Sequence, residues 1–81
     1  MGNWSQEFES VLRSNLPGLD PSQSLEGEVQ LVNYGLDSMG TVTLLVDLES
    51  ALNVQFPDEA LASRTFETAD LLWEQTRRLL T

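Results

Sequence analysis

The sequence contains no cysteine and no histidine. Disulfides, thiolate nucleophiles and zinc sites with cysteine or histidine ligands are therefore excluded, as are Ser-His-Asp and Cys-His catalysis. No stretch approaches the roughly 20 apolar residues that a membrane-spanning helix needs. The N-terminus lacks the basic and apolar regions of a signal peptide. We therefore expect a cytoplasmic protein with no membrane partner.

Basic residues are also scarce. Four arginines stand against thirteen aspartates and glutamates, which gives a formal net charge of −9 at pH 7. The stretch between Arg13 and Arg64 contains eight of these acids and no base. Such a surface repels nucleic acids and attracts partners with basic patches. We therefore expect no nucleic-acid partner.

The 81 residues suffice for one small domain, which we expect to span 1–81. Apolar residues recur at helical spacing in three segments. The predicted helices cover about 3–14, 38–52 and 68–80, and a short helix of one or two turns is predicted at 56–61. Their predicted N-caps are Asn3, Asp37 and Thr68. The chain is therefore expected to be all-α.

About twenty residues, 15–36, connect the first two predicted helices. A strand over 28–32 is conceivable because Val29 and Leu31 alternate with polar residues, but no partner strand is apparent. We therefore interpret this segment as an extended loop, pinned to the helices by Leu19, Leu25, Leu31 and Tyr34. The expected fold is a small all-α bundle with one long, anchored loop.

The second predicted helix has two apolar faces. One stripe forms the expected core face and comprises Thr41, Leu44, Leu45, Leu48 and Leu52. A second stripe, of Met39, Val42 and Val46, lies roughly opposite and is bordered by Glu49. Either the long loop covers this second stripe, or it is an exposed docking face for a partner helix or a basic groove.

Ser38 places a hydroxyl at the start of the second helix, after a glycine turn. The first N–H groups of a helix have no intrahelical acceptor, and the dipole there favours negative charge. A phosphodiester on the Ser38 oxygen would therefore be stabilised. The alternative is that Ser38 has no chemical role and is simply a helix cap or a polar residue at the first helical position. No histidine is present to activate Ser38 as a hydrolase nucleophile.

The motif around Ser38 resembles the Gly-x-Asp-Ser-Leu signature of acyl and peptidyl carrier proteins. The resemblance runs along essentially the whole chain, through Tyr34-Gly35-Leu36-Asp37-Ser38-Met39, Val42, Leu44, Leu48, Glu49, Phe56-Pro57-Asp58 and Phe66-Glu67-Thr68. It implies a right-handed four-helix bundle with a long loop between helices one and two.

The resemblance also implies a cofactor and a set of partners. A phosphopantetheinyl transferase, using coenzyme A and magnesium, would attach 4′-phosphopantetheine to Ser38, and Asp37 would help to place the metal. The thiol of that arm would carry an acyl or aminoacyl group as a thioester, so the protein itself would be no enzyme. The surface read by partner enzymes would comprise Met39, Val42, Val46, Glu49, Asp58 and Glu59.

Departures from the family pattern indicate which type of metabolism the carrier serves. Met39 stands where leucine is usual, a volume-conserving change. Fatty-acid carriers commonly have acids where this chain has Gly40 and Thr43. We therefore expect a discrete, monomeric acyl carrier of polyketide-type metabolism, served by an acyltransferase or ketosynthase with a basic docking patch. The alternatives are an aminoacyl carrier loaded by an adenylating enzyme and a cofactor-free acidic helical adaptor.

Overall fold

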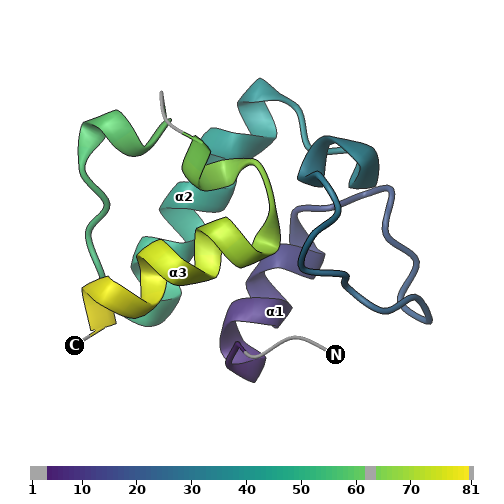
Figure 1. Cartoon of the computed structure of the whole chain (residues 1–81), viewed down its shortest axis with the longest axis horizontal. Helices are drawn as coiled ribbons and strands as arrows, with labels where there is room; N and C mark the ends of the chain where they lie inside the picture. Colours follow the sequence, from purple (N-terminus) through teal and green to yellow (C-terminus); the bar gives the residue numbers. More distant parts are fainter. Residues whose placement is uncertain (1–3, 62–63, 81) are drawn as a thin grey trace.

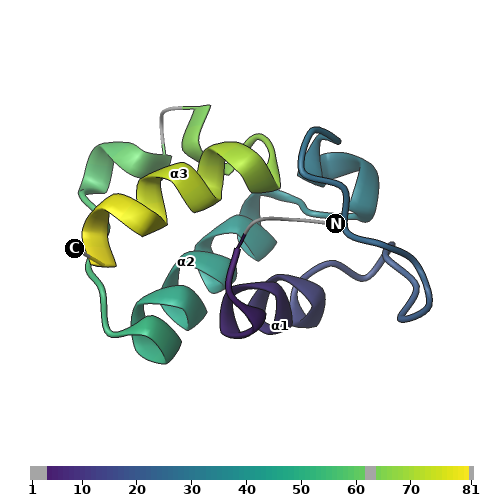
Figure 2. The same ribbon diagram turned by 60° about the horizontal axis from the view of Figure 1, so that its bottom comes forward.

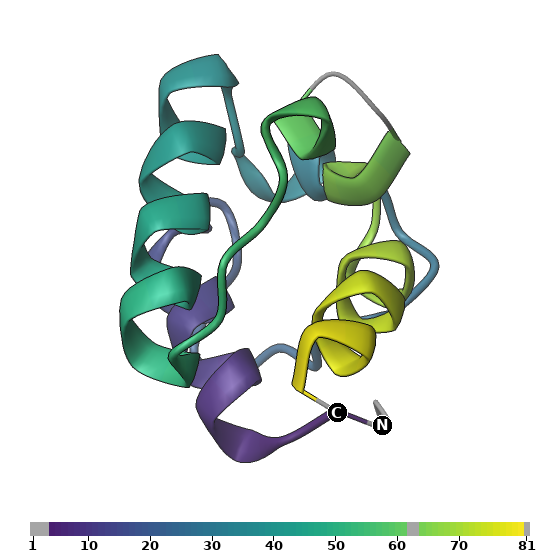
Figure 3. The same cartoon turned by 90° about the vertical axis from the view of Figure 1, so that its left-hand side faces the viewer.

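The computed structural model describes residues 4–61 and 64–80. Within these ranges the chain forms α-helices and short 3₁₀ turns, in the order α1 (Gln6–Ser14), η1 (Leu31–Tyr34), α2 (Ser38–Leu52), η2 (Asp58–Leu61), η3 (Arg64–Phe66) and α3 (Ala69–Leu80). Figure 1 shows the three long helices, and the end-on view of Figure 3 shows α2 and α3 on two sides with α1 below them. The all-α class is confirmed.

The boundaries of α2 and α3 agree with the sequence prediction, but α1 begins later. Thr68 caps α3, because its hydroxyl accepts the N–H of Leu71 at 3.2 Å. The N-cap of α1 is Ser5, whose hydroxyl accepts the N–H of Phe8 at 3.2 Å. The predicted cap at Asn3 is therefore wrong, and Asn3 itself lies outside the described residues.

The short helix predicted at 56–61 is instead the 3₁₀ turn η2. The carbonyl of Pro57 accepts the N–H of Ala60 at 3.0 Å, a three-residue spacing that makes a tighter turn than an α-helix does. Ala60 within this turn is buried, and so is Phe56, two residues before the turn. The four-helix arrangement of the bundle and its handedness stay predictions.

The core lies among the helices and includes the predicted inner face of α2. Leu44 and Leu48 of that face are fully buried. Phe8 of α1 joins two tryptophans, with ring centroids 5.9 Å from Trp4 and 5.0 Å from Trp73 of α3. The whole buried cluster comprises Phe8, Leu12, Leu16, Leu19, Leu25, Leu31, Tyr34, Leu36, Leu44, Leu48, Phe56, Ala60, Phe66, Ala69 and Leu72.

The connection from α1 to α2 is held in place by buried side chains and by backbone hydrogen bonds. It forms the right-hand part of the molecule in Figures 1 and 2. The four residues predicted to pin it (Leu19, Leu25, Leu31 and Tyr34) are all buried. An isolated antiparallel bridge joins Gln30 to Thr68, and the N–H of Leu31 donates to the carbonyl of Glu67 at 2.9 Å. Gln30 and Leu31 therefore contact the residues that precede α3.

The prediction of an extended loop is wrong for 31–34, where the chain forms η1. The N–H of Asn33 donates to the carbonyl of Gln30 at 2.9 Å, which closes the first turn. This turn brings Leu31 and Tyr34 to the same side, and both are buried. An extended segment would alternate its side chains and leave one of the two facing solvent.

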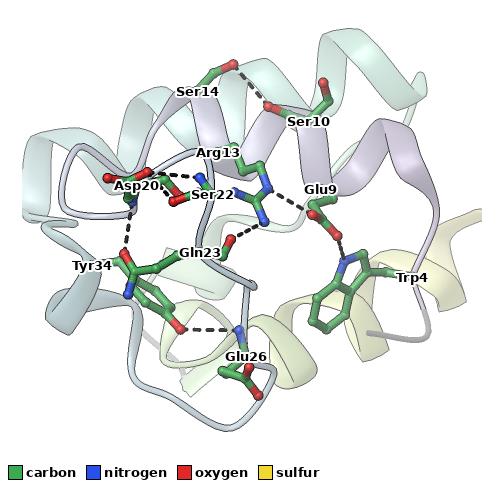
Figure 4. Close-up of polar contacts among 10 residues, drawn as sticks. All are labelled: Trp4, Glu9, Ser10, Arg13, Ser14, Asp20, Ser22, Gln23, Glu26 and Tyr34. Atoms are coloured by element: carbon green, nitrogen blue, oxygen red, sulfur yellow. Dashed lines mark hydrogen bonds and ion pairs between the residues drawn. The ribbon is translucent and has the colours of Figure 1, made fainter. Parts of the chain in front are cut away.

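A polar network ties the same connection to α1 (Figure 4). Arg13 donates to the Oε2 of Glu9 at 2.8 Å and to the carbonyl of Gln23 at 2.7 Å. The indole N–H of Trp4 donates to the other oxygen of Glu9 at 2.9 Å. These partners, first the Trp4 hydrogen bond and then Arg13, hold the pKa of Glu9 below its ordinary value.

Glu9→Gln should remove a pH-dependent part of the stability. Because the folded-state pKa of Glu9 is lowered, its contribution is present above the unfolded-state pKa and is lost as pH falls through the folded pKa. Denaturant unfolding from about pH 7 to about pH 3 should show a wild-type advantage that shrinks at the acidic end. Glu7→Gln, an exposed change on the same helix, controls for the lost charge. A constant difference at every pH would contradict this role of Glu9.

Candidate functional site

The chain enters α2 through a tight turn that follows η1. Gly35 has a φ of 92°, in the left-handed region that favours glycine, and its N–H donates to the carbonyl of Val32 at 3.1 Å. Leu36 is buried, and its N–H donates to the carbonyl of Leu31 at 3.2 Å. The two residues that follow, Asp37 and Ser38, are therefore presented from a fixed backbone.

Asp37 caps α2, as predicted. Its Oδ1 accepts the N–H of Gly40 at 2.7 Å, and its main-chain carbonyl accepts the N–H and the hydroxyl of Thr41 at 2.9 and 2.8 Å. A Cβ at position 40 would lie only 3.0 Å from the same Oδ1 and 3.2 Å from the Cδ1 of Leu36. The first turn of α2 is thus closely packed against the residues that lead into it.

Ser38 is the first residue of α2, and its side chain is exposed. The first N–H groups of a helix lack intrahelical acceptors, and the macrodipole adds a partial positive charge at this end. A phosphate ester on the Ser38 oxygen would therefore lie in a favourable potential. The site combines an accessible hydroxyl, a positive helix end and the neighbouring carboxylate of Asp37.

The second apolar stripe of α2 faces solvent. Met39 is 79% exposed, Val42 49% and Val46 54%. On the opposite face, Leu44 and Leu48 are fully buried. The interpretation in which the long connection covers the stripe is wrong, because that connection packs at α1 and before α3. An apolar strip therefore begins directly beside Ser38 and continues along the helix.

Glu49 does not simply border this stripe. It is half-buried, and its Oε2 accepts the N–H of Phe56 at 2.8 Å. Its main-chain carbonyl accepts the N–H of Val54 at 3.2 Å, where the chain reverses at Asn53 with a φ of 55°. Glu49 thus orders the segment that leads from α2 to η2, a function that sequence patterning missed. Its predicted contact with partner enzymes stays a prediction.

The predicted acids of η2 lie on a different element from the stripe. Glu59 is exposed, whereas the side chain of Asp58 lies outside what the structure describes. A groove lies between η2, α2 and α3, and it is lined by Leu45, Glu49, Gln55, Phe56, Pro57, Leu61, Gln75 and Leu79. The groove places η2 beside the C-terminal half of α2, while Asp37, Ser38 and Met39 lie together at its N-terminus.

The segment of sequence that contains Ser38 has no basic residues. Residues 14–61, which include all of α2, contain no lysine or arginine. Each of the four arginines pairs with a glutamate three or four residues away: Arg13 with Glu9, Arg64 with Glu67, and Arg77 and Arg78 with Glu74. The segment that contains Ser38 therefore carries acidic side chains and no basic ones.

Gly18 is a further residue near the site that sequence reasoning missed. The Pro17-Gly18 pair indicates only that α1 must end. In the structure the N–H of Gly18 donates to the carbonyl of Tyr34 at 2.7 Å, directly before the turn at Gly35. The only sequence signal was the presence of two glycines, and spacing along the chain does not reveal that they meet.

Asp37→Ala should lower the free energy of unfolding by about 1 kcal/mol, the loss typical of a removed N-cap. Ser38→Ala should cost much less, because Asp37 provides the cap hydrogen bond. Denaturant unfolding of the two variants measures both values. A larger loss for Ser38→Ala would show that the hydroxyl of Ser38 has a structural role.

Comparison with known families accounts for this arrangement. The model of the family described as a phosphopantetheine attachment site matches residues 6–69, which is most of the chain. A comparison with individual curated proteins finds no match. No helix in the described ranges is long and apolar enough to cross a bilayer. The chain belongs to the phosphopantetheine-binding carrier family, whose members are non-catalytic shuttles that carry 4′-phosphopantetheine covalently on a serine.

Proposed function

We propose that Ser38 is the serine of this chain that carries 4′-phosphopantetheine. The observation that carries the proposal is its position: among the described serines within the matched residues 6–69, only Ser38 lies in the first turn of an α-helix. Other serines there are engaged differently, since Ser14 donates to the carbonyl of Ser10 and Ser22 donates to Asp20. The positive end of α2 suits a phosphodiester at Ser38.

The residues around Ser38 fit this group. The hydroxyl is exposed, so coenzyme A on a transferase can reach it. Asp37 directly precedes Ser38 and has one carboxylate oxygen engaged by Gly40, and we propose that it helps the transferase to place its magnesium ion. When bound, the arm supplies a thiol that holds the cargo as a thioester. The chain, which has no cysteine, supplies no thiol of its own.

We propose that partner enzymes dock on the exposed stripe of Met39, Val42 and Val46. The stripe is apolar and starts beside Ser38, so an enzyme that covers it also lies near the arm. The surrounding chain carries only acidic charge, which favours partners with basic patches. Glu49, Asp58 and Glu59 complete the proposed surface on its acidic side.

The cargo is proposed to be an acyl group of polyketide-type metabolism, delivered by an acyltransferase or ketosynthase. The support is the pair Gly40 and Thr43, which stand where fatty-acid carriers commonly have acids. Purified holo-protein should accept an acyl group from an acyltransferase and no aminoacyl group from an adenylating enzyme. The reverse outcome, measured by intact mass, would identify an aminoacyl carrier.

Treatment with a promiscuous phosphopantetheinyl transferase, coenzyme A and magnesium should add one phosphopantetheinyl group to the wild-type protein. Ser38→Ala should add none, and its circular dichroism should match that of the wild type because its cap is intact. Intact mass spectrometry measures the gain. If the wild type gains no mass while a control carrier does, the assignment of Ser38 is overturned and a cofactor-free adaptor becomes the better interpretation.

Val42→Asp and Val46→Asp should each raise the KM of the transferase by about tenfold, or about 1.4 kcal/mol of binding free energy. Both side chains are about half exposed, so the helix content should not change. Thr43→Asp adds the same charge to an exposed position of the same helix and should not weaken binding. If the two valine variants unfold the protein, the stripe belongs to the core.

A further inference from the structure

Two segments of the chain cross immediately before the turn that leads to Ser38. The N–H of Gly18 donates to the carbonyl of Tyr34 at 2.7 Å. A Cβ at position 18 would lie 2.8 Å from both the carbonyl carbon and the oxygen of Tyr34, a separation that backbone atoms cannot accept without moving. From the other side, a Cβ at Gly35 would lie 3.0 Å from the nitrogen of Gly18. The crossing therefore needs glycine on both segments.

Gly18 cannot easily move away from this contact. The residues on either side of the Pro17-Gly18 pair, Leu16 and Leu19, are both buried. The N–H of Leu19 also donates to the carbonyl of Leu16 at 3.0 Å, which closes the bend. A side chain added at position 18 would therefore press on the peptide between Tyr34 and Gly35 and strain the turn at Gly35.

A displacement of that peptide would reach Ser38 through the residues that follow. Leu36 is buried, and its Cδ1 lies close to Gly40 in the first turn of α2. Asp37 comes next and holds the N–H of Gly40 at 2.7 Å. Moving the turn at Gly35 would thus disturb the Asp37 cap and loosen the helical turn that contains Ser38.

We propose that Gly18 is a positioning residue for the modification of Ser38. By allowing the two backbones to touch, it fixes the turn at Gly35 and keeps the first turn of α2 formed when the transferase binds. This inference rests on the proposal that Ser38 carries the arm. Gly18 itself touches neither the cofactor nor the docking stripe, so its effect belongs to the transfer step and not to binding.

Steady-state kinetics of phosphopantetheine transfer separate these two effects. Gly18→Ala should lower kcat by about tenfold or more while KM stays within about twofold, because the stripe is unchanged and only the reacting group is misplaced. Gly27→Ala is the matched control, since the three atoms nearest to a Cβ there all belong to the carboxylate of the exposed Asp70, a flexible group that can turn away. It should leave both constants within about twofold of the wild type.

Amide exchange measured by NMR tests, without the transferase, whether the contact at Gly18 stabilises the first turn of α2. The amide of Gly40 should exchange with solvent about tenfold faster in Gly18→Ala than in the wild type, because its hydrogen bond to Asp37 is loosened. Gly27→Ala should leave that exchange unchanged. Gly35→Asn places a side chain at the same crossing, and asparagine tolerates a positive φ. If Gly18→Ala does not fold, Gly35→Asn should show the same loss of kcat.

The outcomes distinguish this inference from the proposed function. If Gly18→Ala is loaded at the wild-type rate with normal Gly40 exchange, the positioning role is overturned while Ser38 remains the modified residue. A change in KM alone would also overturn it. If the wild type gains no phosphopantetheine at all, the assignment of Ser38 is overturned, and with it the role of Gly18 in the modification. The Gly40 exchange rate then measures only whether Gly18 stabilises the first turn of α2.

Discussion

The structure depends on α2 burying only one of its two apolar faces. Leu44 and Leu48 are fully buried, and each side chain of this kind contributes about 1.5–3 kcal/mol by leaving water. The connection from α1 is held at Leu31 against the residues before α3, and the other face of α2 stays exposed. Among the described residues, none covers the outer stripe of Met39, Val42 and Val46, which is left in water.

The exposed face and the hydroxyl belong to one rigid helix. Ser38 and Val46 are eight residues apart, which corresponds to about 12 Å along the axis. The Asp37 cap keeps Ser38 within the helix, where a frayed first turn would let it drift away from the stripe. Recognition of the surface and access to the serine are therefore set by the same element.

Sequence patterning predicts features that depend on residues close together in the chain, such as helix bounds. It misses contacts between segments that turns bring together. The bounds of α2 follow from its apolar repeat and from Asp37, so they are predicted well. Asn3 and Ser5 are both residue types that favour the N-cap position, so the pattern alone does not choose between them, and Ser5 is the cap in the structure. The Gly18 contact and the Glu49 hydrogen bond to Phe56 require segments that are brought together by turns, and local periodicity carries no record of them.

The pairing of every arginine with a nearby glutamate has a consequence at longer range. Each arginine lies beside a glutamate of its own segment, with Arg77 and Arg78 sharing Glu74, and the remaining acids give the chain its net charge of −9. Their field extends for about 10 Å at 0.1 M salt, and two copies of the chain repel each other at that range. At high local concentration the molecules keep their distance from one another, and the stripe on α2 remains open to basic surfaces.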